Sequence, residues 1–203
     1  TGLSDCWDGS MSGKHPSKLA WPNRLQNLMN ITMIKNFSGG GQSNKEIVYT
    51  IQKELSKGTI KQDDVVIVQW TYPDRHCIIA KDRVIQLYPY QVERRHKEAD
   101  VDKRMSKVHY RHLHDNYDVL YQTATHQDYI YHKLKQLNIK QFHMFVDSTA
   151  NYFEWSDVPF LKTSIPHIRA LHPKALDNQH PGEQAHIEVA KSIYKEIEMS
   201  INV

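Results

Sequence analysis

Short runs of apolar, β-branched residues alternate along the chain with longer segments in which apolar residues recur every three or four positions. The runs cover residues 31–37, 63–71 and 141–146, and the second is the most continuous. A continuous run is typical of a strand buried on both faces, and the wider spacing predicts helices. Their alternation predicts an α/β fold with a central parallel sheet covered by helices on both faces.

The helical spacing is clearest near the C-terminus. In residues 183–201 one stripe carries Val189, Ile193, Ile197 and Ile201. The same spacing predicts helices over residues 16–30, after Ser43, over 108–138 as one helix or a pair, and as a short turn over 166–170. We expect a pair of strands over residues 77–90. The strongly charged residues 91–107 are expected to form a mobile segment exposed to solvent.

Size and charge are those of an ordinary globular chain. It has 203 residues, enough for one core, so we expect a single domain over residues 1–203. Net charge is +3 with histidine neutral, which is too small to favour nucleic acid. No apolar run approaches the length of a membrane span, and we recognise no signal peptide.

Cysteine and histidine content narrows the chemistry only slightly. Two cysteines make no disulfide framework, which favours a reducing compartment over a disulfide-rich secreted protein. The 13 histidines do not by themselves indicate metal. His112 and His114 are two apart, whereas ligands on one helical face prefer a spacing of three or four. We therefore predict neither metal nor cofactor.

A glycine-rich loop, residues 38–44, follows the first apolar run. Its three glycines permit positive φ and let backbone N–H groups approach a ligand. Ser43 or Asn44 can cap the next helix, whose apolar face carries Ile47 and Val48 among others. Such a loop at a helix N-terminus suits a phosphate or a developing oxyanion, and a flexible connector is the alternative. No Gly-Lys-Ser/Thr follows, so this is not a P-loop.

The carboxyl end of a central strand is where ligands bind in open α/β sheets. Trp70, Thr71 and Arg75 lie at or just beyond the carboxyl end of the second run, where a substrate would bind. The alternative role is core packing for Trp70 and a surface ion pair for Arg75. An aromatic loop, residues 151–155, carries Trp155; sugars stack on such rings, although aromatic residues in a loop more often close over a core. These residues are the predicted substrate contacts.

Asp177 and His180 form the most suggestive pair. A carboxylate three residues before a histidine can accept from one ring nitrogen and leave the other free as a base. Ser4 lies in a turn-like segment that can expose its hydroxyl, although a capping or turn serine is the alternative.

In order and spacing these motifs resemble the SGNH, or GDSL-like, hydrolase family. Gly2-Leu3-Ser4 is similar to its first block, Asn36 to Gly41 to its second, and Asp177-x-x-His180 to its last. The resemblance implies a flavodoxin-like three-layer α/β/α fold and a catalytic triad of Ser4, His180 and Asp177. It also implies that backbone N–H groups of Ser4 and Gly41 line the oxyanion hole.

The chain departs from the family pattern at three places. The asparagine of the third block is absent from residues 69–75, so Thr71, Gln69 or Asn44 is left to provide the third oxyanion donor. Leu3 replaces the usual aspartate. Almost nothing precedes Gly2, so we expect the first strand to lie upstream of this chain or to be absent.

The resemblance implies a serine esterase that cleaves a small, acetyl-type ester, and the aromatic loop favours a carbohydrate ester or glycan as substrate. Two alternatives remain: acyl transfer by the same residues, and a non-catalytic module of a larger assembly such as a virion. A cytoplasmic or virion-associated protein fits the cysteine usage. The sequence does not predict the oligomeric state.

Overall fold

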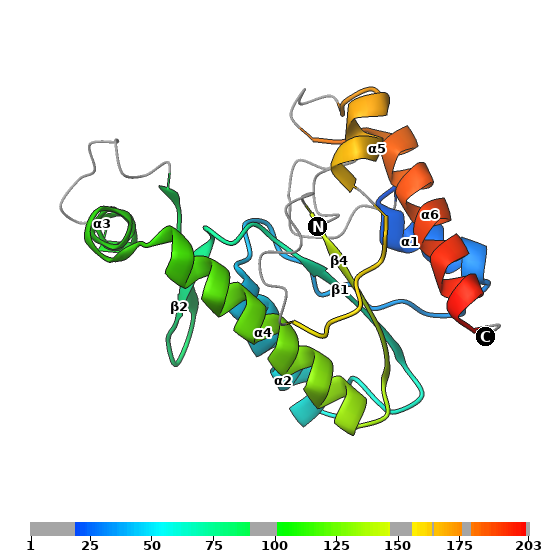
Figure 1. The fold of residues 1–203 in the computed structure, drawn as a ribbon, viewed down its shortest axis with the longest axis horizontal. Coiled ribbons are helices and arrows are strands. Elements are labelled where there is room, and N and C mark those ends of the chain that lie inside the picture. Colours follow the sequence, from blue (N-terminus) through cyan, green and yellow to red (C-terminus); the bar gives the residue numbers. More distant parts are fainter. Residues whose placement is uncertain (1–18, 90–100, 147–155, 164, 176–179, 202–203) are drawn as a thin grey trace. The chain divides into compact units, whose positions relative to one another are not determined.

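The computed structural model describes residues 19–89, 101–146, 156–163, 165–175 and 180–201 (Figure 1). The chain forms two compact units. The terminal unit contains residues 1–40, 144–148 and 160–203, and the central unit contains residues 41–143 and 149–159. The expectation of one domain over residues 1–203 stays a prediction.

The helices of the terminal unit are α1 (Trp21–Met29), α5 (Ile165–Leu171) and α6 (Glu183–Ile201). Asn30 ends α1 in the left-handed conformation, with φ 52°, a conformation common at helix ends. The predicted stripe of α6 is confirmed at Val189, Ile193 and Ile197, which are all buried. Both α1 and α5 pack against α6, so this stripe forms the core of the unit.

The described residues form two small sheets. The strands β1 (Val65–Trp70) and β4 (Lys140–Phe145) form a parallel pair. The strands β2 (His76–Ile79) and β3 (Val84–Leu87) form an antiparallel hairpin, with His76 opposite Leu87 and Ile79 opposite Val84. Three of the predicted strand regions are therefore confirmed: residues 63–71, 77–90 and 141–146.

A series of polar side-chain contacts connects β1, β4 and the helix α4 (Asn116–Gln136), which precedes β4. Trp70 and His143 are both 0% exposed, and the Trp70 indole donates to His143 Nδ1 at 3.0 Å. His143 Nε2 lies 2.8 Å from Gln141 Oε1, and the Gln141 amide donates to the carbonyl of Tyr131 at 2.8 Å. Because His143 Nδ1 accepts a hydrogen bond, His143 Nε2 must carry the proton and donate it to Gln141. Both ring nitrogen atoms of His143 therefore have a partner.

The helices of the central unit are α2 (Asn44–Ser56), α3 (Val101–Val108), the π-helix η2 (His109–Leu113) and α4 (Asn116–Gln136). Val48 and Ile51 form the buried face of α2, as predicted. Asp115 caps α4, because its carboxylate accepts from the backbone N–H groups of Tyr117 and Asp118. This cap divides the predicted helical region 108–138 into a pair.

Two predictions about the chain are wrong. Residues 31–37 form no strand, and Ile31, Met33 and Phe37 are 42%, 65% and 41% exposed. Their β-branched composition provides only propensity, and a strand also needs a paired neighbour and a buried face. Residues 101–107 are helical rather than irregular, because α3 packs against β3 and η2.

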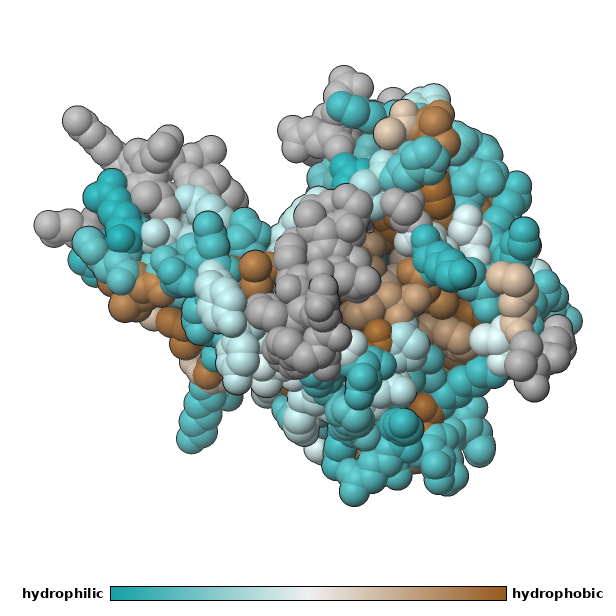
Figure 2. All heavy atoms as spheres, in the orientation of Figure 1, coloured by the Kyte–Doolittle hydropathy of each residue, from teal (hydrophilic) through white to brown (hydrophobic). Residues whose placement is uncertain are grey.

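The described residues form a mixed α/β structure with a small parallel pair, and each sheet has two strands. No described helix is both long enough and apolar enough to cross a membrane. On the face drawn in Figure 2, hydrophilic residues are interspersed with smaller groups of hydrophobic ones.

Candidate functional site

The glycine loop ends at the N-terminus of α2. Gly41 has φ 77°, in the left-handed region that disfavours residues with a Cβ. A Cβ there would lie 2.6 Å from the hydroxyl oxygen of Tyr88, so the Tyr88 side chain would have to shift to make room for it. Ser43 caps α2 by accepting from the backbone N–H of Glu46 at 3.2 Å. The loop thus has the positive φ and the capped helix N-terminus that the sequence predicted.

Asn44 joins this loop to the end of β1. Its side-chain Oδ1 accepts from the backbone N–H of Thr71 at 2.9 Å, and its Nδ2 donates to the carbonyl of Thr71 at 3.2 Å. The same Nδ2 donates to Thr123 Oγ1 on α4 at 3.2 Å. Asn44 is 2% exposed, so three elements meet at one buried amide. Both amide N–H groups of Asn44 and the backbone N–H of Thr71 are engaged inside the protein.

Arg75 lies four residues beyond Thr71. Its guanidinium donates to Thr71 Oγ1 at 2.8 Å and stacks over the ring of Tyr72, 5.0 Å from the centroid. Arg75 is half-buried and pairs with none of the described carboxylates. The structure therefore brings three of the predicted site residues, Asn44, Thr71 and Arg75, together at the carboxyl end of β1.

Other predicted site residues have different surroundings. The ring of Trp70 is wholly buried, and its only N–H donates to His143, so this side chain contributes to the core. Ser4, Trp155 and Asp177 lie outside the described residues. His180 belongs to the terminal unit and is half-buried.

The segment that carries His180 is tied at its base. The backbone N–H of Ala175 donates to the carbonyl of His180 at 2.9 Å, and that of Gly182 donates to the carbonyl of Pro173 at 3.1 Å. Lys174 and Pro181 form an isolated antiparallel bridge. A Cβ on Gly182 would lie 2.6 Å from the Pro173 carbonyl oxygen, so the chains approach this closely only with glycine there.

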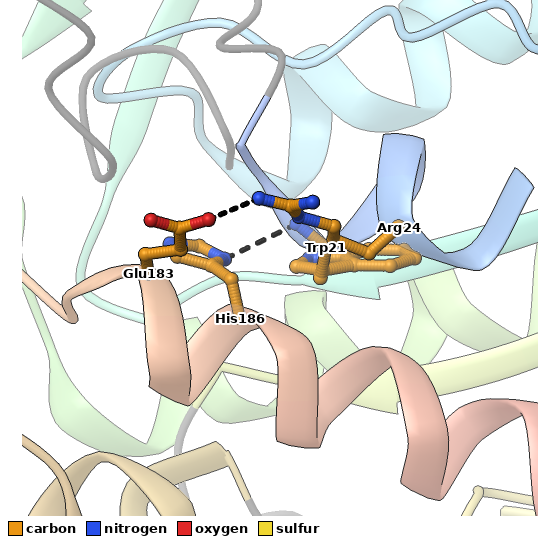
Figure 3. Close-up of polar contacts among 4 residues, drawn as sticks. All are labelled: Trp21, Arg24, Glu183 and His186. Atoms are coloured by element: carbon orange, nitrogen blue, oxygen red, sulfur yellow. Dashed lines mark hydrogen bonds and ion pairs between the residues drawn. The ribbon is translucent and has the colours of Figure 1, made fainter. Parts of the chain in front are cut away.

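Helix α6 starts directly after this bridge and is anchored to α1, as Figure 3 shows. The backbone N–H of Trp21 donates to His186 Nδ1 at 3.2 Å, and His186 is 4% exposed. Arg24 forms an ion pair with Glu183 in the first turn of α6, where a carboxylate also suits the helix dipole. These contacts fix the start of the helix that follows His180.

A second cluster in the central unit consists of His76, His109 and His114, which we call the three-histidine cluster. The ring of His76 lies 4.3 Å from that of His109 and 5.7 Å from that of His114, measured between centroids. The rings of His109 and His114 are 6.1 Å apart. The Nε2 atoms of all three are buried and have no hydrogen-bond partner among the described residues.

Burial and like charges lower the pKa values of His76 and His109. The pKa of His76 falls from 6.5 to about 4, chiefly through burial and then through His109, His114, Lys45 and His126. Burial also lowers the pKa of His109, and His114 adds to that effect. All of the charged groups named for these shifts are cationic when protonated, so they all oppose a further proton.

Sequence reasoning missed this cluster because it tested the wrong spacing. A π-helix bonds residues five apart, and here the backbone N–H of His114 donates to the carbonyl of His109 at 2.9 Å. That repeat brings His109 and His114 together, whereas an α-helical repeat would separate them. The spacing of five was visible in the sequence, but nothing there indicated a π-helix.

In the part of the chain that the structure describes, no group of three histidine, cysteine, aspartate or glutamate side chains is placed to hold a metal ion. No protein-family model, curated protein or solved structure matches this chain.

Proposed function

We propose that this protein is a serine esterase of the SGNH type that cleaves small, acetyl-type esters. The observation that carries the proposal is the pairing of Asn44 with Thr71. It holds the glycine loop and the N-terminus of α2 at the carboxyl end of β1. Backbone N–H groups at such a helix start favour a developing oxyanion.

In the proposed reaction His180 takes the proton of Ser4 as the hydroxyl oxygen attacks the ester carbonyl, and Asp177 orients the imidazole. The N–H groups of Ser4 and Gly41 stabilise the oxyanion. Collapse of the tetrahedral intermediate releases the alcohol, which takes the proton from His180. Water, activated by His180, then hydrolyses the acyl-enzyme and restores the serine.

The proposal includes a flavodoxin-like fold and a carbohydrate ester as the substrate. A flavodoxin-like three-layer arrangement would bring the carboxyl ends of its parallel strands to one edge, where such a triad assembles. The guanidinium of Arg75, held by Thr71 and Tyr72, offers further donors to a polar acceptor such as a sugar. Trp155 is the proposed stacking partner for that sugar.

One observation favours the non-catalytic alternative, an SGNH-like binding module. The two amide N–H groups of Asn44 and the backbone N–H of Thr71 already bond within the protein. Thr71 Oγ1 accepts from Arg75 and keeps its own hydroxyl proton. Of the proposed donors of Thr71 and the Asn44 side chain, this hydroxyl is the one that could still serve as the third oxyanion donor. Loss of one oxyanion donor reduces the rate by roughly 10²–10³-fold, which would leave a slow enzyme.

Labelling with a fluorophosphonate tests the two functions directly. The esterase proposal expects one adduct on Ser4 in the wild type and none in Ser4→Ala, with Ser10→Ala labelled like the wild type. Turnover of a chromogenic acetyl ester should fall by roughly 10⁴-fold in Ser4→Ala and in His180→Asn. A wild type that neither reacts nor turns over, with an intact circular dichroism spectrum, would favour the module.

The same assay separates hydrolysis from transfer. With an added sugar acceptor, hydrolysis produces the free acid regardless of acceptor concentration. A product in which the acyl group appears on the acceptor, in proportion to its concentration, would identify an acyltransferase that uses the same residues.

A further inference from the structure

We propose that the three-histidine cluster is a proton-sensitive contact, in which protonation of the rings separates the π-helix η2 from the strand β2. This inference is independent of the proposed esterase activity. It rests on the packing of three imidazoles from two elements and on their buried nitrogen atoms without partners.

The cluster joins two parts of the central unit that are distant in sequence. His76 is the first residue of β2, His109 is the first residue of η2, and His114 directly follows η2. Tyr110 makes the neighbouring attachment, because its hydroxyl lies 2.6 Å from the carbonyl oxygen of Asp74 and 3.0 Å from that of Leu87. The rings and this hydroxyl together hold η2 against the β2–β3 hairpin.

Neutral imidazoles suit this arrangement and imidazolium ions do not. A protonated ring has two N–H donors, and each buried donor without an acceptor is unfavourable. The three Nε2 atoms have no acceptor among the described residues, and the rings are close enough to repel one another once charged. Protonation therefore favours a state in which the rings separate and water reaches the nitrogen atoms.

Two cationic groups outside the cluster increase this effect. Lys45 of α2 and His126 of α4 both act on His76 as like charges. Asp74 and Arg75 act on Tyr110, whose pKa burial raises, so this phenol stays protonated across the acid range. The carboxylate of Asp115 accepts hydrogen bonds from backbone N–H groups in the first turn of α4. The helix α3, which packs against η2, carries the basic residues Lys103, Arg104 and Lys107.

The expected event is local and graded with pH. Above about pH 6.5, the ordinary pKa of histidine, the rings of His76 and His109 are neutral and packed. As the pH falls towards the lowered pKa of His76, about 4, protons bind first to molecules in which η2 has separated from β2. The buried histidine His143, which has partners on both nitrogen atoms, should not take part.

Hydrogen exchange from pH 7.5 to 4.5, corrected for intrinsic rates, tests the proposal. In the wild type, exchange of residues 76–79 and 109–114 should increase at least tenfold more than that of β1. In His76→Phe, which keeps an aromatic ring and cannot be protonated, the increase should fall to the level of β1. His112→Gln changes an exposed histidine of the same π-helix and should behave like the wild type.

Three results would overturn the proposal. One is unchanged protection of both segments at pH 4.5 in the wild type. Another is an equal increase in His76→Phe, since the acid effect would then lie elsewhere. The third is a rise in the melting temperature with equimolar Zn²⁺ that His76→Phe removes, because the cluster would then be a metal site. Should His76→Phe not fold, histidine titration by NMR in the wild type decides: pKa values near 6.5 for both His76 and His109 would refute the proposal.

Discussion

Two histidines of the central unit, the buried His143 and the half-buried His76, have pKa values lowered to about 4, yet their surroundings differ. His143 is bonded through both ring nitrogen atoms, to Trp70 and to Gln141. His76 packs against other imidazoles, and its Nε2 atom has no partner among the described residues. Burial alone lowers the pKa of His143, whereas like charges add to burial at His76. A lowered pKa therefore does not by itself separate a structural histidine from a responsive one.

The largest expected effect is at His143. His143→Leu removes the acceptor of the Trp70 indole in a site with no solvent, and a buried unsatisfied donor costs about 1–3 kcal/mol. With the lost Gln141 contact we expect the free energy of unfolding to fall by about 2–4 kcal/mol. Urea denaturation at pH 7.5 measures it. His132→Leu, at an exposed position of α4, should change it by less than about 0.5 kcal/mol. Equal effects of the two substitutions would contradict the structural role of His143.

Asn44 extends the comparison to a second group whose hydrogen bonds are complete. Asn44→Ala leaves the backbone N–H and carbonyl of Thr71 and the hydroxyl of Thr123 without their buried partner. We expect a loss of about 2–3 kcal/mol in the free energy of unfolding. Lys53→Ala, at an exposed position on the same helix, serves as the control. A loss below about 0.5 kcal/mol would show that water replaces the amide.

The pH dependence of stability follows from the direction of these shifts. In the unfolded chain histidine binds protons near pH 6.5, whereas native His143 and His76 bind them near pH 4. Their contribution is therefore fully present above about pH 6.5 and is lost as the pH falls through 4. His143 adds at most about 1.4 kcal/mol per pH unit, and His76 adds less because solvent reaches it. Urea denaturation between pH 7.5 and 4.5 tests this, and a flat profile would refute it.

The smallest effect is expected at His76, at neutral pH. Replacing a buried polar atom that has no partner by an apolar group of similar shape is nearly neutral or stabilising. His76→Phe should therefore change the free energy of unfolding at pH 7.5 by less than about 1 kcal/mol, in contrast to His143→Leu. A destabilisation by more than about 2 kcal/mol would show that the His76 ring has a stabilising polar partner in the native state, contrary to this expectation.

Several elements could be predicted from local pattern. The stripe of α6, the apolar face of α2 and the hairpin β2–β3 follow from spacing and composition, because each depends mainly on neighbouring residues. For residues 31–37 the same local pattern predicted a strand that does not form, because a strand also needs a neighbouring strand, which local composition does not determine. The candidate site follows the same division. Gly41 and Ser43 could be foreseen from the loop, whereas the bonds of Asn44 to Thr71 and Thr123 join residues 27 and 79 apart.

The sequence by itself determined where most of the helices and strands form, and it placed glycine at positions such as Gly41 where the backbone takes positive φ. Only the tertiary structure decided which buried polar groups have hydrogen-bond partners and which do not. His143 and His76 are the same residue type, and neither has a local pattern that distinguishes it. Their difference arises from what packs beside them, because hydrogen-bond partners and neighbouring charges come from segments far apart in the chain.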